Sequence, residues 1–202
     1  MNGFVVIVGY LLGSIPFGLL FARFRGVDIR AAGSGNIGAT NVGRSVGKRE
    51  GIWTLACDIG KGVVAVLIAW GAALPTGWVA TVCLAVVLGH VYSPWLRFRG
   101  GKGVAATAGA FLAAAPLPLL ICLLVFALVV KASRRVSLGS VVSAAALPFS
   151  LWGLDAAPQM IAAGAIAAVV IIVKHKDNLR RLKAGTEPPL GAVTCPPETG
   201  AV

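Results

Sequence analysis

Long apolar stretches alternate with short clusters of basic residues along the chain. Every Lys and Arg except Lys61 falls in one of four groups, which span residues 23–49, 97–102, 131–135 and 174–183. Short loops rich in Lys and Arg stay on the cytoplasmic side of a membrane, so we expect all four groups on the same side. The chain must then cross the membrane an even number of times between consecutive groups, and two crossings per gap is the smallest solution.

Each gap between basic groups contains a turn rich in Pro or Gly, a composition that ends helices; the turns are at residues 75–77, 116–118 and 153–158. The opening segment, residues 2–22, lacks a preceding basic region and a small-residue cleavage site, so we interpret it as a retained span. The pattern therefore predicts an all-α polytopic membrane protein with seven transmembrane helices, some of them short. The amino terminus is expected outside and the carboxyl terminus in the cytoplasm.

The middle gap, residues 104–130, allows two interpretations. Two helices there would each be about 20 Å long, shorter than a bilayer core of about 30 Å. A single tilted helix kinked at proline is the alternative, but it would place the third and fourth basic groups outside, against the charge rule. We expect one integral membrane domain over residues 1–202, in which residues 184–202 form a flexible cytoplasmic tail.

Composition supports the membrane interpretation. Hydrophobic residues make up 57% of the 202 residues, charged residues only 12%, and the mean hydropathy is +0.88. The net charge of +11 favours anionic lipid head groups or anionic substrates as partners. Nucleic acid is not expected, because no basic stripe is interleaved with exposed aromatic residues. The four cysteines form no zinc pattern with His90 or His175, so we expect no metal site.

The loop after the first apolar segment, GSGNIGATNVGR at residues 33–44, is rich in hydrogen-bond donors. Glycines let backbone N–H groups turn toward an anion, and arginine presents a planar fork that matches phosphate. A merely solvated loop is the alternative. The GxGxxG pattern within it lacks the βαβ context of a dinucleotide site, so we reject that interpretation. The candidate substrate-binding residues here are Ser34, Asn36, Thr40, Asn41 and Arg44.

A second candidate is the Gly-Gly-Lys-Gly turn that immediately precedes an apolar helix. Lys102 between Gly101 and Gly103 would place a cation and free N–H groups at a helix start, as in phosphate sites. The spacing of a P-loop fails, since Leu96 stands where its first glycine belongs. An ordinary positively charged loop at the membrane edge is the alternative.

Two further clusters adjoin basic groups. Ser137 and Ser140 follow the third group, where a helix cap and charge anchor explain them equally well. His175 and Asn178 are three residues apart as the last span ends, a spacing that lets both reach one ligand from one helix face, although a structural His in a basic tail is the alternative.

Asp58 and Lys61 are the only charges well inside an apolar segment, and their i, i+3 spacing allows an ion pair. Both are interpreted as lying in the first turns of that helix, where their charged ends snorkel to the membrane edge. Structural pairing is slightly favoured over a functional role.

Four segments together resemble the PlsY family of acyl-phosphate:glycerol-3-phosphate acyltransferases. They are GSGNIGATNVGR, GHVYSPWLRFRGGKGVAAT, RRVSLGS and HKDNLRRLKAGTEP, at residues 33–44, 89–107, 134–140 and 175–188. The match covers nearly the whole chain. Members of this family are seven-helix bacterial inner-membrane proteins with the active site on the cytoplasmic side. One departure is Ser93, inserted between the aromatic residue and proline after Gly-His, which leaves the role of His90 open.

The resemblance implies transfer of a fatty acyl group from acyl phosphate to the sn-1 hydroxyl of glycerol 3-phosphate, giving lysophosphatidic acid and inorganic phosphate. This is the first acylation of bacterial phospholipid synthesis, and no cofactor is expected. Transient docking of a soluble enzyme that forms acyl phosphate is compatible with this interpretation. By resemblance, Ser34, Arg44, Lys102, His175 and Asn178 would hold glycerol 3-phosphate, and Thr40, Asn41 and Ser140 the phosphate end of the donor. The Asp58 to Gly62 stretch and Glu187 receive supporting roles only.

Acyl phosphate is a mixed anhydride with a good leaving group, so no covalent enzyme intermediate is required. The sequence contains no HxxxxD pair, since Trp95 and Arg180 stand five residues after the two histidines. Arg44, Lys102 and His175 are the candidate catalytic residues. The proton of the attacking hydroxyl goes either to His175 or to a phosphate oxygen of the donor, and we favour the donor.

A small anion transporter is the main rival function, and a membrane scaffold without chemistry is a third. The transporter predicts polar residues at mid-membrane, whereas the span interiors here are almost wholly Ala, Val, Leu, Ile and Gly.

Overall fold

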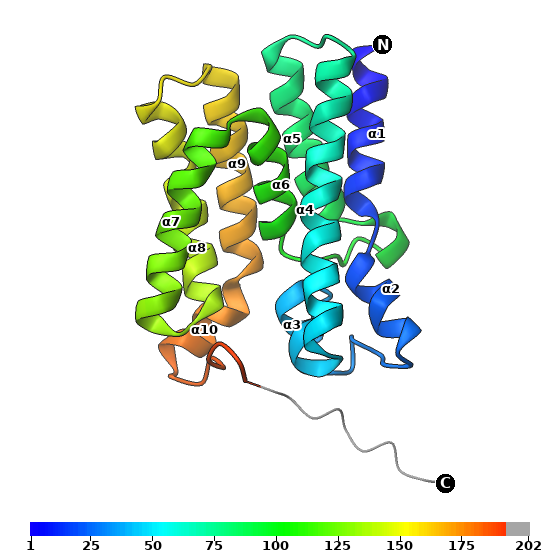
Figure 1. Ribbon diagram of the computed structural model, residues 1–202, viewed down its shortest axis with the longest axis vertical. Coiled ribbons are helices and arrows are strands. Elements are labelled where there is room, and N and C mark those ends of the chain that lie inside the picture. Colours follow the sequence, from blue (N-terminus) through cyan, green and yellow to red (C-terminus); the bar gives the residue numbers. More distant parts are fainter. Residues whose placement is uncertain (193–202) are drawn as a thin grey trace, which may run out of the picture.

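The computed structural model describes residues 1–192, and the regular structure within them is entirely helical (Figure 1). The predicted all-α class is therefore confirmed. The helices are α1 (Asn2–Ser14), α2 (Phe17–Phe24), α3 (Ala39–Ser45), α4 (Lys48–Gly71), α5 (Thr76–Val91), a 3-10 turn η1 (Pro94–Leu96), α6 (Val104–Ala114), α7 (Pro116–Ser133), α8 (Val136–Gly153), α9 (Pro158–Lys174) and α10 (Lys176–Lys183).

Within residues 1–192, five segments are long and apolar enough to cross a membrane: Asn2–Phe24, Lys48–Gly71, Thr76–Leu96, Pro116–Ser133 and Val136–Gly153. Helices α9 and α10 pass the same test only when taken together, and they are bent by 57° at the break between them. Helix α6 is apolar but has only 11 residues, about 16 Å at 1.5 Å per residue. The protein is therefore a multi-pass membrane protein by length and composition.

Two predicted spans differ in detail from the structure. The opening span is broken at Ile15 and Pro16 into α1 and α2, because proline does not continue a helix across that point. Residues 104–130 form two helices that meet at Ala115, so a single kinked helix is excluded. The expectation of two equal helices is wrong, because Pro116 begins the second one early and leaves 11 residues for α6 and 18 for α7.

Glycines bring the backbones of the amino-terminal helices into contact. A Cβ at Gly13 of α1 would lie 2.2 Å from the Val86 carbonyl oxygen of α5, and one at Gly109 of α6 would lie 1.9 Å from the Ile59 carbonyl oxygen of α4. Small residues allow such close approach where a bilayer supplies little hydrophobic driving force between helices. Helices α1 to α6 consequently form one tightly packed set, the amino-terminal group.

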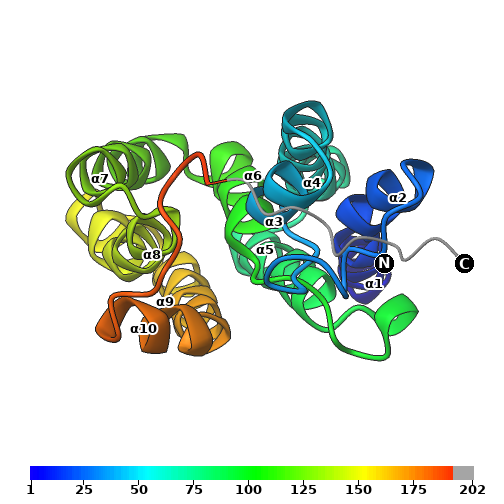
Figure 2. The ribbon, with the colours of Figure 1, turned by 90° about the horizontal axis from the view of Figure 1, so that it is seen from below.

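Helices α7 to α10 form a second set, the carboxyl-terminal group, which Figure 2 shows beside the first. The two groups meet where α9 contacts α5 and where α7 follows α6. Residues 186–190 run back across the end of the molecule, and the Leu190 backbone N–H donates to the Arg134 carbonyl oxygen at 2.6 Å. This part of the predicted tail is therefore held against the bundle, while residues 193–202, including Cys195, lie outside the described residues.

Candidate active site

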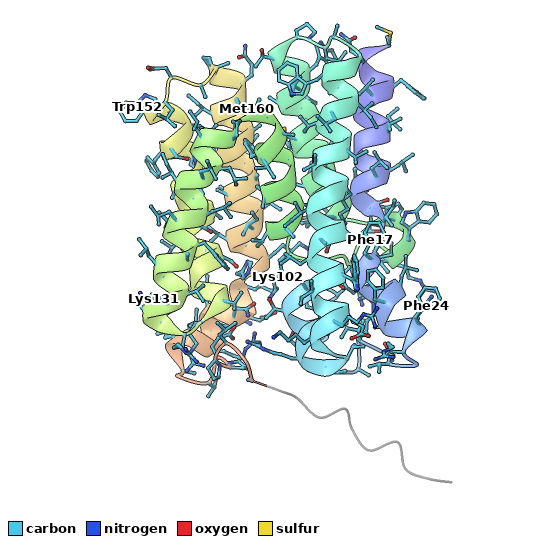
Figure 3. All side chains as sticks on the ribbon, in the orientation of Figure 1. Phe17, Phe24, Lys102, Lys131, Trp152 and Met160 are labelled. Carbon is cyan, nitrogen blue, oxygen red and sulfur yellow. The ribbon has the colours of Figure 1, made fainter. Side chains whose placement is uncertain are left out.

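A cavity of about 540 Å³ lies between the two groups, and Figure 3 shows Lys102 at this junction. Its walls come from the 33–44 loop, α4 and α6 on one side and from α7, α8, α10 and the chain after α10 on the other. The predicted site residues that line it are Ser34, Asn36, Thr40, Asn41, Arg44, Lys102, Gly103, Ser137, Ser140, His175 and Asn178. Four segments far apart in the sequence thus meet at one cavity.

The 33–44 loop is folded around the side chain of Asn41. Its amide nitrogen donates to the carbonyl oxygens of Ala32 at 3.1 Å and Asn36 at 2.9 Å, and its amide oxygen accepts from the Ser34 backbone N–H at 2.9 Å. Asn41 is buried. These bonds fix the conformation of the loop and hold Ser34 and Asn36 at the cavity. Asn41 therefore has a structural role in the site.

Arg44 extends from the end of α3 across the mouth of the cavity. Its guanidinium donates to the carbonyl oxygens of Pro188 at 3.2 Å and Pro189 at 3.1 Å. The partners are neutral carbonyls, so the positive charge of Arg44 has no anionic partner in direct contact within residues 1–192.

Lys102 lies in the turn that starts α6. Gly103, with φ of +91°, is the N-cap of that helix, a conformation that favours glycine. The Lys102 ammonium donates to the side-chain oxygen of Asn178 across the cavity. Burial lowers the pKa of Lys102 to about 8, with Glu187 acting in the opposite direction. A partly desolvated cation of this kind gains from an incoming phosphate.

His175 lies at the bend between α9 and α10, not within one continuous helix as the sequence suggested. Its Nδ1 is 2.8 Å from the Ile171 carbonyl oxygen, so Nδ1 carries the proton and Nε2 can accept one. Burial is the main cause that lowers the pKa of His175 to about 4, and the imidazole is therefore neutral. A neutral ring of this kind accepts a hydrogen bond from a hydroxyl rather than attracting an anion.

Glu187 supports the wall that carries Asn178. Its two carboxylate oxygens accept from the Asn178 amide nitrogen and from Arg181 Nε, each at 2.7 Å. Glu187 is only 4% exposed. The family resemblance assigned this residue a supporting role but did not indicate its contacts, because Glu187 follows the last helix and faces the site only after the chain turns back.

Thr107 is a cavity residue that the sequence did not single out. It is buried one turn into α6, and among the described residues its hydroxyl has no hydrogen-bond partner. Gly101 is the one predicted site residue that does not line the cavity. A Cβ there would lie 2.1 Å from His90 Nε2, so it packs behind the lysine instead.

Beyond the polar mouth, the cavity continues between apolar side chains. Leu119, Leu123 and Phe126 of α7 face Ala144 and Leu147 of α8 along this part. Phosphate-sized polar groups and a hydrocarbon chain can therefore occupy one continuous space.

Residues 3–185 match the family model described as "Glycerol-3-phosphate acyltransferase". The chain belongs to this family. Similar proteins named glycerol-3-phosphate acyltransferase come from Geobacter sulfurreducens, 51% identical over 89% of this chain and 93% of that protein, and from Symbiobacterium thermophilum, 45% identical over 95% and 96%.

Two crystal structures of PlsY (YgiH), an integral membrane glycerol 3-phosphate acyltransferase, share the fold of this family member. The TM-score is 0.90 for the glycerol 3-phosphate form and 0.87 for the lysophosphatidic acid form, and both are 36% identical to this chain. Each alignment covers 94% of this chain, together with 96% of the first crystallised chain and 95% of the second. The family assignment made from the four sequence motifs is confirmed.

Proposed function

We propose that this chain transfers a fatty acyl group from acyl phosphate to the sn-1 hydroxyl of glycerol 3-phosphate. The observation that carries the proposal is the composite cavity, in which cationic, hydroxyl and amide groups at the mouth adjoin an apolar extension. The proposal also rests on membership of the glycerol-3-phosphate acyltransferase family.

Arg44, Lys102, Ser34 and Asn178 would hold the phosphate and hydroxyls of glycerol 3-phosphate. The arginine and lysine exchange neutral acceptors for phosphate oxygens when substrate binds, which strengthens their interactions. Their charge also offsets repulsion between the two bound phosphate groups. Holding both reactants in one orientation supplies about 7–11 kcal/mol toward the barrier in favourable cases.

Thr40, Asn36 and Ser140 would face the phosphate of the donor, with Ser137 beside them and Asn41 holding the loop in shape. The acyl chain would lie along α7 and α8. Thr107 lies on the opposite wall with an unpartnered hydroxyl, which suits it to donate to the acyl carbonyl oxygen as negative charge develops there.

In the reaction, the sn-1 oxygen attacks the acyl carbonyl carbon and the bond from that carbon to the phosphate oxygen breaks. Phosphate leaves with the electron pair and takes up the proton of the attacking hydroxyl. The low pKa of His175, about 4, makes it a weak proton acceptor near neutral pH, so its Nε2 orients the hydroxyl instead.

A His175→Ala enzyme tests this division of labour. We expect a KM for glycerol 3-phosphate raised about tenfold with kcat within about threefold of wild type, which is the loss of one binding contact. Steady-state rates at saturating acyl phosphate measure both constants. A kcat lowered 100-fold or more with little change in KM would instead assign the proton transfer to His175.

The proposed topology places α1 with α2, α4, α5, α6, α7, α8 and α9 as seven crossings, with the amino terminus outside. Figure 1 is consistent with this arrangement, since α2, α3 and α10 lie at one end and the amino terminus at the other. Lys131 lies toward the end occupied by α10, and Trp152 toward the opposite end (Figure 3). The charge rule makes the α3 and α10 end cytoplasmic, in the bacterial inner membrane.

Purified protein in detergent or nanodiscs, given acyl phosphate and glycerol 3-phosphate, should form lysophosphatidic acid and release one inorganic phosphate per turnover. Acyl-CoA in place of acyl phosphate should be a poor donor. Sealed proteoliposomes that moved glycerol 3-phosphate without acylating it would contradict the proposal and favour the transporter function.

A further inference from the structure

Three buried polar side chains form a cluster on helices of the amino-terminal group, and two of them, Asp58 and His90, also line the cavity. Asp58 and Lys61 of α4 form an ion pair with 2.7 Å between Oδ1 and Nζ, as their spacing predicted. The Lys61 ammonium is also 2.8 Å from Nδ1 of His90 on α5. The three residues are between 2% and 5% exposed. Asp58 and Lys61 lie near the middle of α4, so the expectation that the pair snorkels from the first turns is wrong; His90 lies in the last turn of α5.

Lys61 joins this cluster to the break in the first span. Its ammonium donates to the Ile15 carbonyl oxygen at 3.0 Å, beside Pro16. A lysine ammonium is only a donor, so Nδ1 of His90 accepts and the ring proton is on Nε2. The orientation of the His90 ring is thereby fixed by α4 and, through Lys61, by the end of α1.

His90 in turn contacts the two glycines that precede Lys102. The backbone N–H of Gly101 donates to the His90 carbonyl oxygen, and that of Gly100 donates to the Val91 carbonyl oxygen, both at 3.0 Å. A Cβ at Gly101 would lie 2.1 Å from Nε2 of the His90 ring, whereas a Cβ at Gly100 would lie 2.0 Å from the His90 backbone oxygen. The turn therefore rests directly on His90.

We propose that Asp58, Lys61 and His90 are positioning residues that fix the location of Lys102 by holding the Gly100–Gly101 turn against the His90 ring. This inference rests on the proposed function, because it assigns Lys102 to substrate phosphate. Burying charged groups among apolar helices is costly. Here that cost is offset by the internal ion pair and hydrogen bonds, and the cluster provides a rigid support for a turn whose glycines have no side chains to anchor it.

The support has a measurable signature, because the two glycines contact different parts of His90. Gly101→Ala places a methyl group against the ring and creates a steric clash. Removal of the ring in His90→Ala should therefore relieve that clash. Gly100→Ala places a methyl group against the backbone oxygen, which His90→Ala leaves in place. Gly100 thus provides a matched control one residue away from Gly101.

The experiment is a pair of double-mutant cycles on the full-length enzyme in nanodiscs, read out as KM for glycerol 3-phosphate and kcat. We expect G101A and G100A each to raise KM at least 30-fold and H90A to raise it about tenfold, with smaller changes in kcat. Adding G101A to H90A should raise KM less than threefold further, whereas adding G100A should still raise it at least tenfold. G60A, on α4 with nothing within 4 Å of its Cβ, should behave as wild type.

The proposal would be overturned if G101A raised KM by the same factor with and without the His90 ring. It would also be overturned if H90A left KM unchanged. If H90A is not recovered folded, His90→Ser repeats both cycles with the same criteria. A folded wild-type enzyme that forms no lysophosphatidic acid would refute the proposed function itself, which separates that failure from failure of the positioning role.

Discussion

The two walls of the cavity are held in place by different means. In the amino-terminal group, site residues are fixed from behind: Asn41 organises its own loop, and the turn before Lys102 rests on His90. In the carboxyl-terminal group, Asn178 depends on Glu187, which belongs to the chain beyond the last helix. The amino-terminal wall is therefore part of a closely packed helix bundle. The carboxyl-terminal wall depends on the non-helical segment that folds back after α10.

Among residues 1–192, the hydrogen bonds that cross the cavity mouth come from two of the candidate catalytic residues, Arg44 and Lys102. Lys102 donates to Asn178, and Arg44 donates to the carbonyl oxygens of Pro188 and Pro189. Substrate phosphate would replace neutral acceptors with charged ones. The same side chains thus join the two walls when the cavity is empty and would hold the ligand when it is full.

The largest effect is expected where the two walls meet. Lys102→Ala should lower kcat/KM for glycerol 3-phosphate by at least 1,000-fold, because it removes the buried positive charge proposed to face both phosphates. Lys102→Arg should retain part of the activity, since the charge remains but the geometry changes. Phosphate release from acyl phosphate measures the rate. If kcat/KM of K102A were within tenfold of wild type, the lysine would have no essential part in the mechanism.

The carboxyl-terminal wall should depend on one carboxylate. Glu187→Gln replaces an acceptor oxygen by a donor NH₂ that faces either Asn178 or Arg181, both of which already donate to this residue. We expect about 2 kcal/mol of lost stability and an approximately 30-fold lower kcat/KM. Thermal unfolding in detergent and steady-state rates check the two effects.

Asp177 supplies the matched control for Glu187. It forms an exposed pair with Arg180 on α10, at 3.4 Å. Exposed pairs contribute little to stability. The stability of Asp177→Asn should therefore stay within about 0.5 kcal/mol of wild type, and its kcat/KM within about twofold. Equal effects of E187Q and D177N would show that the buried carboxylate does not hold this wall.

A smaller effect is expected on the amino-terminal wall at Thr107. Thr107→Val removes the buried hydroxyl, so kcat should fall about tenfold, while the melting temperature should not fall because no hydrogen bond among the described residues is lost. Thr107→Ser keeps the hydroxyl and should restore most of the rate. A T107V enzyme that melts earlier but turns over normally would make the residue structural.

Sequence patterns predicted the surfaces of this site better than its supports. The four motifs carry Gly, Ser, Asn, Lys and Arg in polar loops, where such residues stand out against apolar spans, and eleven of the twelve predicted site residues line one cavity. The all-α fold class could be predicted from the hydropathy of the chain. The break at Pro16 and the short length of α6 could not be predicted, because proline is tolerated at the end of a span or inside a helix, as Pro148 is in α8.

The supports were hidden because they depend on packing between segments distant in sequence. Nothing near Gly101 in the chain indicates that it packs on the His90 ring, and nothing near Lys61 indicates a bond to Ile15. Thr107 resembles any other small residue in an apolar helix. Its significance appears only once α6 is placed beside the cavity with the hydroxyl unpartnered.

The pH dependence of catalysis tests the two walls together, because the ionisation of Lys102 depends on both. Burial lowers its pKa to about 8, so in the free enzyme the ammonium loses its proton as pH rises through about 8. The charged form is the one that binds phosphate. We therefore expect kcat/KM for glycerol 3-phosphate to be flat well below pH 8, to bend near pH 8 and to fall about tenfold per pH unit well above it.

Bound phosphate stabilises the protonated lysine, so kcat should begin to fall at a higher pH than kcat/KM does. Lys102→Arg should abolish the decline near pH 8, because a guanidinium stays charged throughout this range. Initial rates between pH 6.5 and 9.5, with substrate ionisation measured separately, provide the profiles. If K102R declined at the same pH as wild type, the titrating group would be another residue or the substrate, and the desolvation of Lys102 between the two walls would have no role in setting the rate.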